Sequence, residues 1–368
     1  MIVAYDSRFA CNHFVGIGTY AFALLEALLA LPGDERYVVL WDPRQSHARF
    51  DFKDVRSHPR VTWVERPYRP LGPWALVQVG AWLRRLTPDV YFSPFHLLPL
   101  MPGCPCVLTV HDVRPLRFGD ELDPVRRALF RLSLQRACRA RFLITVSDFS
   151  RAEIVALLPA APARVRTVRP GVQPRLGSLA LERPPAVPNE PFALVVGDNR
   201  PHKNHAVLAS AWARFGASPP LALVGAGPVD ERHPDMTMLA RRAGVQAHHL
   251  GRVSQGELAW LYQHATLLLF PSRYEGFGSP LAEAFAQGLP AVVSDLPVFR
   301  EIGGDAACFV EPDRADRWAE VVADLARDAA ARERMSAAGR ARVVGLTYEQ
   351  TARSLLEVLH QARRTVRP

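Results

Sequence analysis

The stretch Phe270–Pro290, FPSRYEGFGSPLAEAFAQGLP, has the residue order expected where a β-strand leads through a glycine loop into a helix. The apolar run Thr266–Phe270 predicts a buried strand before the loop, and Ala291–Ser294 predicts the next strand. Leu281–Gln287 between them reads as a helix, with Ser279 as its N-cap and a proline in the first turn. Strand, loop, helix and strand in this order are typical of a parallel α/β sheet.

Glu275 of this stretch falls on the loop at the carboxyl end of the predicted strand. Gly276 and Gly278 carry no Cβ, so the backbone there can approach a ligand closely. The first N–H groups of a helix favour anions, and Glu283 lies in its first turns. An isolated E-x7-E pair is most simply part of a capped surface helix. The ordered strand, glycines, helix and acids favour a site for a diphosphate instead.

The same alternation of apolar runs and amphipathic segments extends over the whole chain. Predicted strands outside the quoted region are Ile2–Asp6, Tyr37–Asp42, Val61–Glu65, Val90–Ser93, Cys106–Val110, Phe142–Ser147, Phe192–Gly197, Leu221–Gly225 and His248–Leu250. Predicted helices are Thr19–Leu31, Trp74–Leu86, Pro124–Cys138, Phe149–Leu157, Ala206–Phe215, Ser254–His264 and Tyr348–Arg363. The proline-rich stretch Leu181–Pro191 has no periodicity and predicts a linker.

The predicted fold class is therefore α/β, with two Rossmann-like domains facing each other across a cleft. The first domain is expected at residues 1–180 and the second at 192–345, with a linker at 181–191. A helix within 346–368 follows and is expected to pack back on the first domain. A length of 368 residues fits two domains better than one.

Composition limits the possible partners and the location of the protein. No apolar run is long enough to span a bilayer and the first residues lack the pattern of a signal peptide, so we expect a cytoplasmic protein. The net charge is +9, yet zinc-finger spacing and RNA-binding aromatic signatures are missing, which disfavours nucleic acid. Eight arginines between Arg114 and Arg141 predict either a solvated face or peripheral contact with an anionic membrane.

Gly16-x-Gly18-x-x-Ala21 fits a dinucleotide-binding fingerprint, and Asp42 ends a predicted strand about 20 residues later. A nicotinamide-dependent oxidoreductase is therefore an alternative interpretation. The fingerprint glycines should follow the first strand directly, whereas Ser7–Val15 intervenes. The second half also has the more complete phosphate site, so the oxidoreductase is disfavoured.

Ordered motifs in both halves resemble those of the family 4 retaining glycosyltransferases, which have the GT-B fold. The segment Phe270–Pro290 is similar to the E-x7-E signature of that family, and the likeness extends over essentially the whole chain. The other matching stretches are Val15–Tyr20, Thr109–Asp112, Thr145–Ser150, Val196–Gly197, Pro201–Asn204 and Asp295–Gly304.

The resemblance implies donor-binding roles in the second domain. Glu275 is expected to contact the donor sugar, while the backbone from Gly276 through Phe277 to Gly278 holds diphosphate or sugar oxygens. Glu283 is expected to accept hydrogen bonds from ribose hydroxyls. Lys203, one of only two lysines in the chain, is expected to neutralise the leaving diphosphate.

Further roles are implied in the first domain, which the resemblance marks as the acceptor-binding one. Gly16 would let the first helix approach the phosphates, and His111 would lie over the reacting sugar. One position departs from the family pattern: Asp198 stands where many members have a phosphate-binding arginine, and Arg200 is the candidate replacement.

The resulting prediction is a retaining transfer of a hexose, with mannose from GDP-mannose as the best guess, to a glycan or lipid-linked acceptor. UDP- and dTDP-sugars stay open as donors. No cofactor and no metal are expected, since no D-x-D occurs in the sequence and the Cys104-x-Cys106 pair lacks partner ligands. A GT-B sugar-nucleotide epimerase and a GT-B module that only binds are the remaining alternatives.

Overall fold

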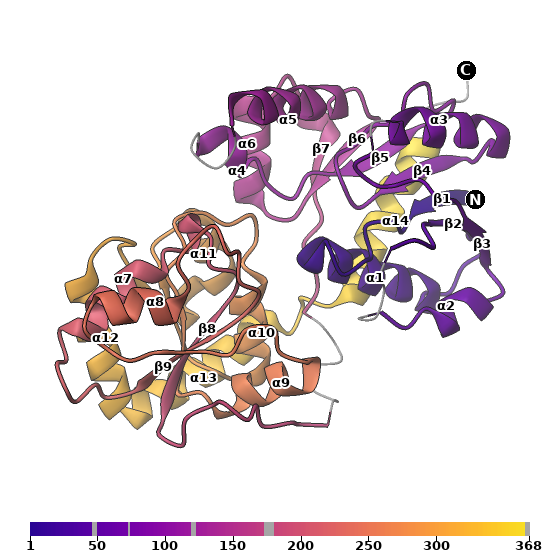
Figure 1. The fold of residues 1–368 in the computed structure, drawn as a ribbon. Helices are drawn as coiled ribbons and strands as arrows, with labels where there is room; N and C mark the ends of the chain where they lie inside the picture. Colours follow the sequence, from indigo (N-terminus) through magenta and orange to yellow (C-terminus); the bar gives the residue numbers. More distant parts are fainter. Residues whose placement is uncertain (46–49, 73, 119–122, 173–179, 365–368) are drawn as a thin grey trace. The chain divides into compact units, whose positions relative to one another are not determined.

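The computed structural model describes residues 1–45, 50–72, 74–118, 123–172 and 180–364 (Figure 1). The chain divides into two compact units. Unit 1 comprises Met1–Gly171 together with Leu346–Pro368, and unit 2 comprises Val172–Gly345. Each unit is a parallel sheet covered by helices, as the near-continuous apolar strands predict.

Unit 1 is built on a seven-stranded parallel sheet in the order β3-β2-β1-β4-β5-β6-β7. Its strands are β1 Ile2–Asp6, β2 Arg36–Trp41, β3 Val61–Glu65, β4 Val90–Ser93, β5 Cys106–Thr109, β6 Phe142–Thr145 and β7 Val165–Thr167. Its helices are α1 Val15–Ala30, α2 Lys53–Ser57, α3 Ala75–Leu86, α4 Arg114–Arg117, α5 Pro124–Ala137, α6 Asp148–Leu157 and α14 Tyr348–Arg364. A 3₁₀ turn, η1, spans Pro162–Arg164.

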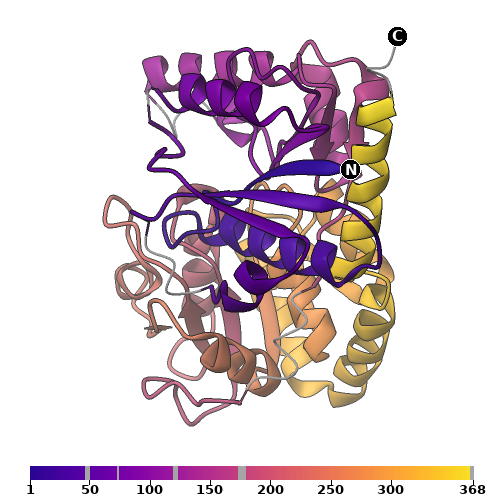
Figure 2. The ribbon, with the colours of Figure 1, turned by 90° about the vertical axis from the view of Figure 1, so that its right-hand side faces the viewer.

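The two faces of this sheet are covered by different helices. Alternate strand residues point to opposite faces, so Val3 and Tyr5 pack with α1, α2 and α14, whereas Ala4 packs with α3, α5 and α6. The C-terminal helix α14 packs against α1 (Figure 2), and its Leu355 and Leu359 are completely buried.

Unit 2 has a six-stranded parallel sheet in the order β10-β9-β8-β11-β12-β13. Its strands are β8 Phe192–Val196, β9 Ala222–Ala226, β10 His248–His249, β11 Leu267–Phe270, β12 Ala291–Ser294 and β13 Ala307–Val310. Its helices are α7 His205–Ala213, α8 Met236–Arg242, α9 Gln255–His264, α10 Ser279–Gln287, α11 Pro297–Gly303, α12 Ala315–Arg327 and α13 Ala329–Val343, with 3₁₀ turns η3 Pro201–Lys203 and η4 Gly304–Ala306. Helices α7, α8 and α12 share one apolar core with the sheet, and α9, α11 and α13 surround α10 (Figure 1).

The division between the units differs from the predicted one. It falls at Gly171–Val172, so the stretch Leu181–Pro191, expected as a linker, is part of unit 2. The reason is local packing: Val187 is buried, and Glu182 accepts a hydrogen bond from the Ser254 hydroxyl (3.2 Å). A high proline content indicates that a segment forms neither helix nor strand, but it does not indicate that the segment lacks packing contacts.

Candidate active site

The predicted donor site lies where the strand order of unit 2 reverses. β8 and β11 are neighbours in the sheet, while the chain continues from β8 to β9 on one side and from β11 to β12 on the other. The loops after the carboxyl ends of two such strands diverge and leave a ligand site. Here they are also joined, because the Arg273 N–H donates to the His202 carbonyl (2.8 Å).

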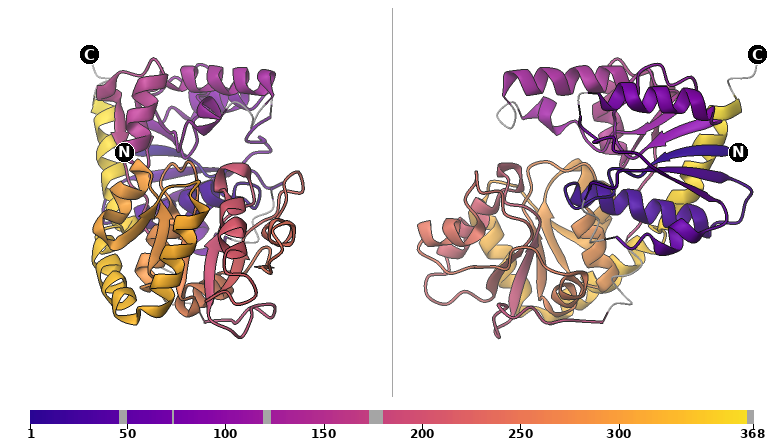
Figure 3. Two further views of the ribbon diagram at one scale, coloured as in Figure 1. Left: turned by 90° about the vertical axis from the view of Figure 1, so that its left-hand side faces the viewer. Right: turned by 45° about the vertical axis from the view of Figure 1, so that its right-hand side comes forward.

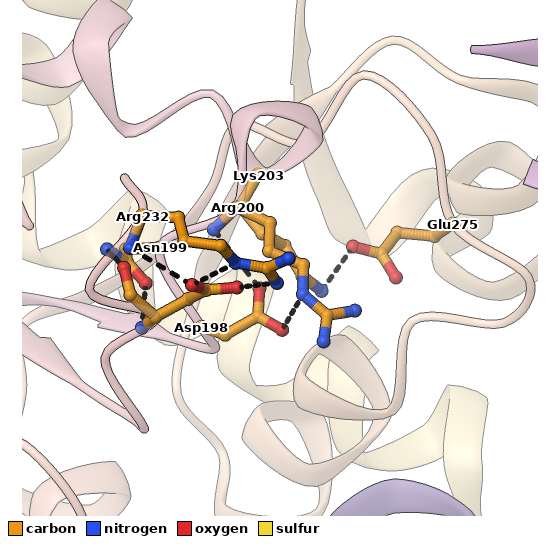
Figure 4. Close-up of polar contacts among 7 residues, drawn as sticks. Asp198, Asn199, Arg200, Lys203, Arg232 and Glu275 are labelled. Atoms are coloured by element: carbon orange, nitrogen blue, oxygen red, sulfur yellow. Dashed lines mark hydrogen bonds and ion pairs between the residues drawn. The ribbon is translucent and has the colours of Figure 1, made fainter. Parts of the chain in front are cut away.

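Lys203 and Glu275 meet at this point, one from the loop after β8 and one from the loop after β11 (Figure 4). Lys203 Nζ lies 2.7 Å from Glu275 Oε1, and both side chains are mostly buried. The hydroxyl of Ser272, which is fully buried, donates to the same oxygen (2.7 Å). Gly197 lies beside the lysine stem, where a Cβ would be in ordinary van der Waals contact with Lys203 Cε (3.6 Å); its φ of +148° is what favours glycine there. The sequence indicated the lysine and the glutamate, but not Ser272.

The N-terminus of α10 differs in one detail from the prediction. Gly278, not Ser279, is the N-cap; its φ is +94° and no side chain caps the helix. A Cβ at Gly278 would lie 2.7 Å from the Phe299 ring, so glycine is required both by backbone conformation and by packing. The first amides of α10 therefore lack a side-chain cap and suit an anionic ligand. Gly276 lies on the same loop, and the side chain of Phe277 is buried, which leaves its backbone as its contribution.

Glu283 lies one turn into α10 and accepts a hydrogen bond from the Tyr262 hydroxyl of α9 (2.8 Å). Burial raises the pKa of Glu283 to about 7, and the Tyr262 hydrogen bond opposes that rise. Tyr262 is almost fully buried, and the pKa of its phenol is raised by burial and by the carboxylate, so it stays a donor at neutral pH. Tyr262 thus holds the Glu283 carboxylate in place. The sequence did not indicate this contact, because the helical period marks that face of α9 only as apolar.

Donor affinity should depend on pH through Glu283. Only the ionised carboxylate is a full acceptor for ribose hydroxyls, so a pKa of about 7 predicts roughly tenfold tighter binding at pH 8 than at pH 6. Calorimetry with an intact nucleotide sugar tests this, because its diphosphate is a diester and stays ionised over that range. Tyr262→Phe should move the midpoint to higher pH, and Glu283→Gln should flatten the profile. A flat wild-type profile would remove Glu283 from ribose binding.

Asp198 and Arg200 form a pair beside this site (Figure 4). Arg200 Nε lies 3.5 Å from Asp198 Oδ2, and the Arg200 N–H also approaches the aspartate (3.3 Å). The acid that departs from the family pattern is thus partly balanced by the arginine two residues later. Asn199 between them is buried and donates to the Asp230 and His233 carbonyls (3.0 and 2.7 Å), which fixes this loop to the loop after β9. A phosphate contact for Arg200 stays a prediction.

His111 lies in unit 1, after β5. Its Nε2 is 2.9 Å from the Pro94 carbonyl, which can only accept, so Nε2 carries the proton. Burial lowers the pKa of His111 below its usual range, against opposing effects of this hydrogen bond and of Asp112. A neutral ring with a proton on Nε2 leaves Nδ1 as an acceptor for a hydroxyl. Tyr20 packs edge-on against the ring at 5.1 Å.

The glycines that suggested a dinucleotide site lie inside α1 and not in a turn after β1. Gly16 is exposed and an added Cβ would meet nothing within 4 Å, whereas a Cβ added to Gly18 would lie 3.1 Å from the Phe9 and Cys11 carbonyl oxygens. Asp42 is fully buried and paired with Arg44 (3.0 Å), so it is not presented to a ribose. The geometry of these residues is therefore inconsistent with a nicotinamide-dependent oxidoreductase. A contact between Gly16 and the phosphates stays a prediction.

In the described part of the chain, no cluster of three or more His, Cys, Asp or Glu side chains is arranged to hold a metal ion. The same residues include no helix with the length and apolar character of a membrane span.

These features define a two-unit α/β protein with a candidate anion site at the switch point of its second sheet. Sequence comparison agrees: the profile described as Glycosyltransferase Family 4 matches residues 14–176, and the profile described as Glycosyl transferases group 1 matches residues 181–342. The chain belongs to glycosyltransferase family 4, and it is a glycosyltransferase.

Three relatives illustrate the range of the family. O-antigen chain mannosyltransferase B of Escherichia coli is 29% identical over 77% of this chain and 76% of its own length. O-antigen chain mannosyltransferase RfbU of Salmonella typhimurium is 29% identical over 62% of this chain and 63% of its own length. D-inositol 3-phosphate glycosyltransferase of Actinosynnema mirum is 32% identical over 71% of this chain and 68% of its own length. The mannosyltransferase-like character predicted from the motifs agrees with the first two.

Solved structures show the same fold at low identity. Sucrose-phosphate synthase from Thermosynechococcus elongatus has a TM-score of 0.72 at 17% identity and covers 99% of this chain and 100% of its own. HepE of Anabaena, solved with UDP and glucose, has a TM-score of 0.73 at 14% identity and covers 98% and 100%. The fold is that of the GT-B glycosyltransferases, as predicted.

Proposed function

We propose that this chain transfers mannose from GDP-mannose to a glycan or lipid-linked acceptor, with retention of the anomeric configuration. The observation that carries the proposal is the Lys203–Glu275 pair beside the uncapped N-terminus of α10. Two of the relatives are mannosyltransferases of O-antigen chains, which supports the sugar and the acceptor class. Cytoplasmic location and peripheral contact with an anionic membrane belong to the same proposal.

In the proposed reaction the bond between the sugar carbon and the diphosphate oxygen breaks, and the diphosphate leaves with the electron pair. A bond forms to an acceptor hydroxyl, and the proton of that hydroxyl passes to an oxygen of the departing diphosphate. Lys203 and the α10 N-terminus lie where the negative charge of the leaving group increases, and such preorganised charges stabilise a transition state. Glu275 would orient the sugar hydroxyls, Glu283 the ribose, and His111 Nδ1 would accept from a sugar hydroxyl.

A thermal-shift screen against GDP, UDP, dTDP and their sugars tests the donor. A ligand at a concentration of about a hundredfold its Kd should stabilise the native state by about 2.7 kcal/mol. When all ligands are compared at the same concentration, the preferred nucleotide should therefore give the largest rise in Tm. GDP-mannose is expected to rank first. A larger shift with UDP-glucose, the ligand in one Anabaena HepE structure, would contradict the proposed donor. The anomeric configuration of the product, read by NMR, tests retention.

The proposed transfer needs neither a metal nor a cofactor. Lys203 and the α10 N-terminus together carry about one and a half positive charges, of which Glu275 balances about one in the ligand-free protein. Turned toward the diphosphate, these charges would take the electrostatic role that a metal has in other transferases. Initial rates with the preferred donor should therefore be unchanged in excess EDTA. If EDTA abolishes activity and magnesium or manganese restores it, the diphosphate site has been misassigned.

A further inference from the structure

One helical layer of unit 1 exposes most of the large apolar side chains found on the surface. Of the twelve large hydrophobic residues exposed in the described part of the chain, seven lie on α3, on α5 or on the loops flanking α3. They are Leu71, Trp74, Val77, Met101, Val125, Leu129 and Leu132. Both helices pack on the same face of the sheet and belong to the helical layer that covers it (Figure 3).

The spacing of these residues directs them away from the core. Val125, Leu129 and Leu132 of α5 follow the i, i+4, i+7 pattern of one helix face, while Leu134 and Ala137 form the buried face. Leu129 is 60% exposed.

On α3, Trp74 and Val77 lie opposite the buried Val79 and Leu83, and Trp74 is 70% exposed. The loop that carries Met101 is held close to α3, since a Cβ on Gly80 would lie 1.8 Å from the Leu100 carbonyl oxygen.

The same two segments are strongly basic. No acidic residue occurs between Glu65 and Asp89 or between Asp123 and Asp148. The arginines of these segments are Arg66, Arg69, Arg84, Arg85, Arg126, Arg127, Arg131, Arg136, Arg139 and Arg141. Arg126 pairs with the helix cap Asp123 (3.2 Å). Exposed apolar side chains and arginines on the same two helices, with a tryptophan among the apolar residues, match the chemistry of an anionic lipid surface.

We propose that the outer face of α3 and α5 is a docking surface for an anionic membrane, with Trp74, Leu129 and Leu132 entering the headgroup region. A second copy of this chain is the less favourable occupant, because a symmetric contact places the arginines of one copy against those of the other. This proposal rests on the proposed function, which includes peripheral membrane contact, and adds the residues that make that contact. Vesicle binding is measured without donor or acceptor, so its result does not depend on whether the proposed transfer occurs.

The test is flotation of the full-length protein with vesicles of phosphatidylglycerol and phosphatidylcholine in equal parts. Wild-type protein should float with these vesicles at low salt and not with pure phosphatidylcholine. Leu129→Ser with Leu132→Ser should weaken binding at least about tenfold, because two leucines lose their apolar contact. Arg127→Gln with Arg131→Gln should weaken it roughly tenfold to thirtyfold. The Trp74 part of the fluorescence, obtained by difference from Trp74→Phe, should shift to shorter wavelength on binding.

Matched controls come from unit 2. Val229→Ser with Met238→Ser removes two exposed apolar side chains, and Arg327→Gln with Arg334→Gln removes the same charge; both should bind as wild type. All substituted residues are exposed, so unchanged Tm values will show that the variants fold. Failure of the wild type to float at low salt overturns the proposal, as does equal binding by the leucine variant. Self-association that the leucine variant abolishes would instead assign the face to a second copy.

Discussion

Replacing Lys203 by alanine should lower kcat by about 10²–10³-fold, because the positive lysine stabilises the negative charge that develops on the leaving diphosphate. The prediction rests on its position at the switch point of unit 2 and on its 2.7 Å contact with Glu275. Steady-state rates at saturating donor separate kcat from KM. Lys53→Ala is the matched control, since it removes the other lysine of the chain from an exposed helix of unit 1.

The partner carboxylate gives the complementary result. Glu275 neutralises Lys203 in the ligand-free protein, so Glu275→Gln should leave nucleotide diphosphate binding unchanged or tighter while turnover falls. Lys203→Ala with normal kcat and raised KM would mean that the lysine only binds. Glu275→Gln with full turnover would show that the carboxylate does not orient the sugar.

The second large effect concerns stability and not chemistry. Leu355→Ala or Leu359→Ala in α14 should each destabilise unit 1 by about 2–5 kcal/mol, since both leucines are fully buried against α1. Hydrogen exchange resolved by peptide should show lost protection in α1 and β1, while α7 and β8 of unit 2 keep theirs. Leu356→Ala, at a half-buried position of the same helix, should cost less.

Equal loss of protection in both units would contradict that expectation, because it would mean that they unfold as one.

Polar contacts add to the packing of α14 on unit 1. His360 Nε2 lies 3.0 Å from Glu35 Oε1, and Arg363 Nε lies 3.1 Å from Asp89 Oδ1. Removing α14 is therefore expected to lower the stability of unit 1 more than any single substitution in this helix.

The sequence predicted the strands of both sheets because buried parallel strands are short and almost wholly apolar. Val61–Glu65, Val90–Ser93 and Ala291–Ser294 agree residue for residue. The capping box of Ser254 and Glu257 also forms as predicted, since a local pattern suffices for it. Two strands, β7 and β13, and the helices α2, α4, α8 and α11–α13 were not assigned. Both strands are only partly buried, and α13 has weak amphipathic periodicity. Helix α12 is clearly amphipathic, with Trp318, Ala319 and Val322 on its buried face, so its pattern was missed rather than lacking.

The sequence marked the candidate site residues that follow strand ends, but not those whose hydrogen bonds reach distant segments. Lys203 and Glu275 are 72 positions apart, yet each follows a strand end that the sequence marks. Tyr262 and Asn199 carry no such mark, because their hydrogen bonds reach α10 and the loop after β9. The N-cap of α10 was misassigned since Ser279 is a good cap by residue type, whereas the positive φ of Gly278 depends on the loop conformation.

The return of α14 to unit 1 has a consequence for folding during synthesis. The ribosome produces all of Val172–Gly345 after the seven strands of unit 1 and before the helix that completes its core. At about 5–20 residues per second, that interval lasts about 9 to 35 seconds. Throughout it, the apolar face of α1 that α14 later covers has no native partner, while unit 2 has its whole sequence and can fold first. Nascent unit 1 is thus the part of this protein that chaperones would be expected to bind.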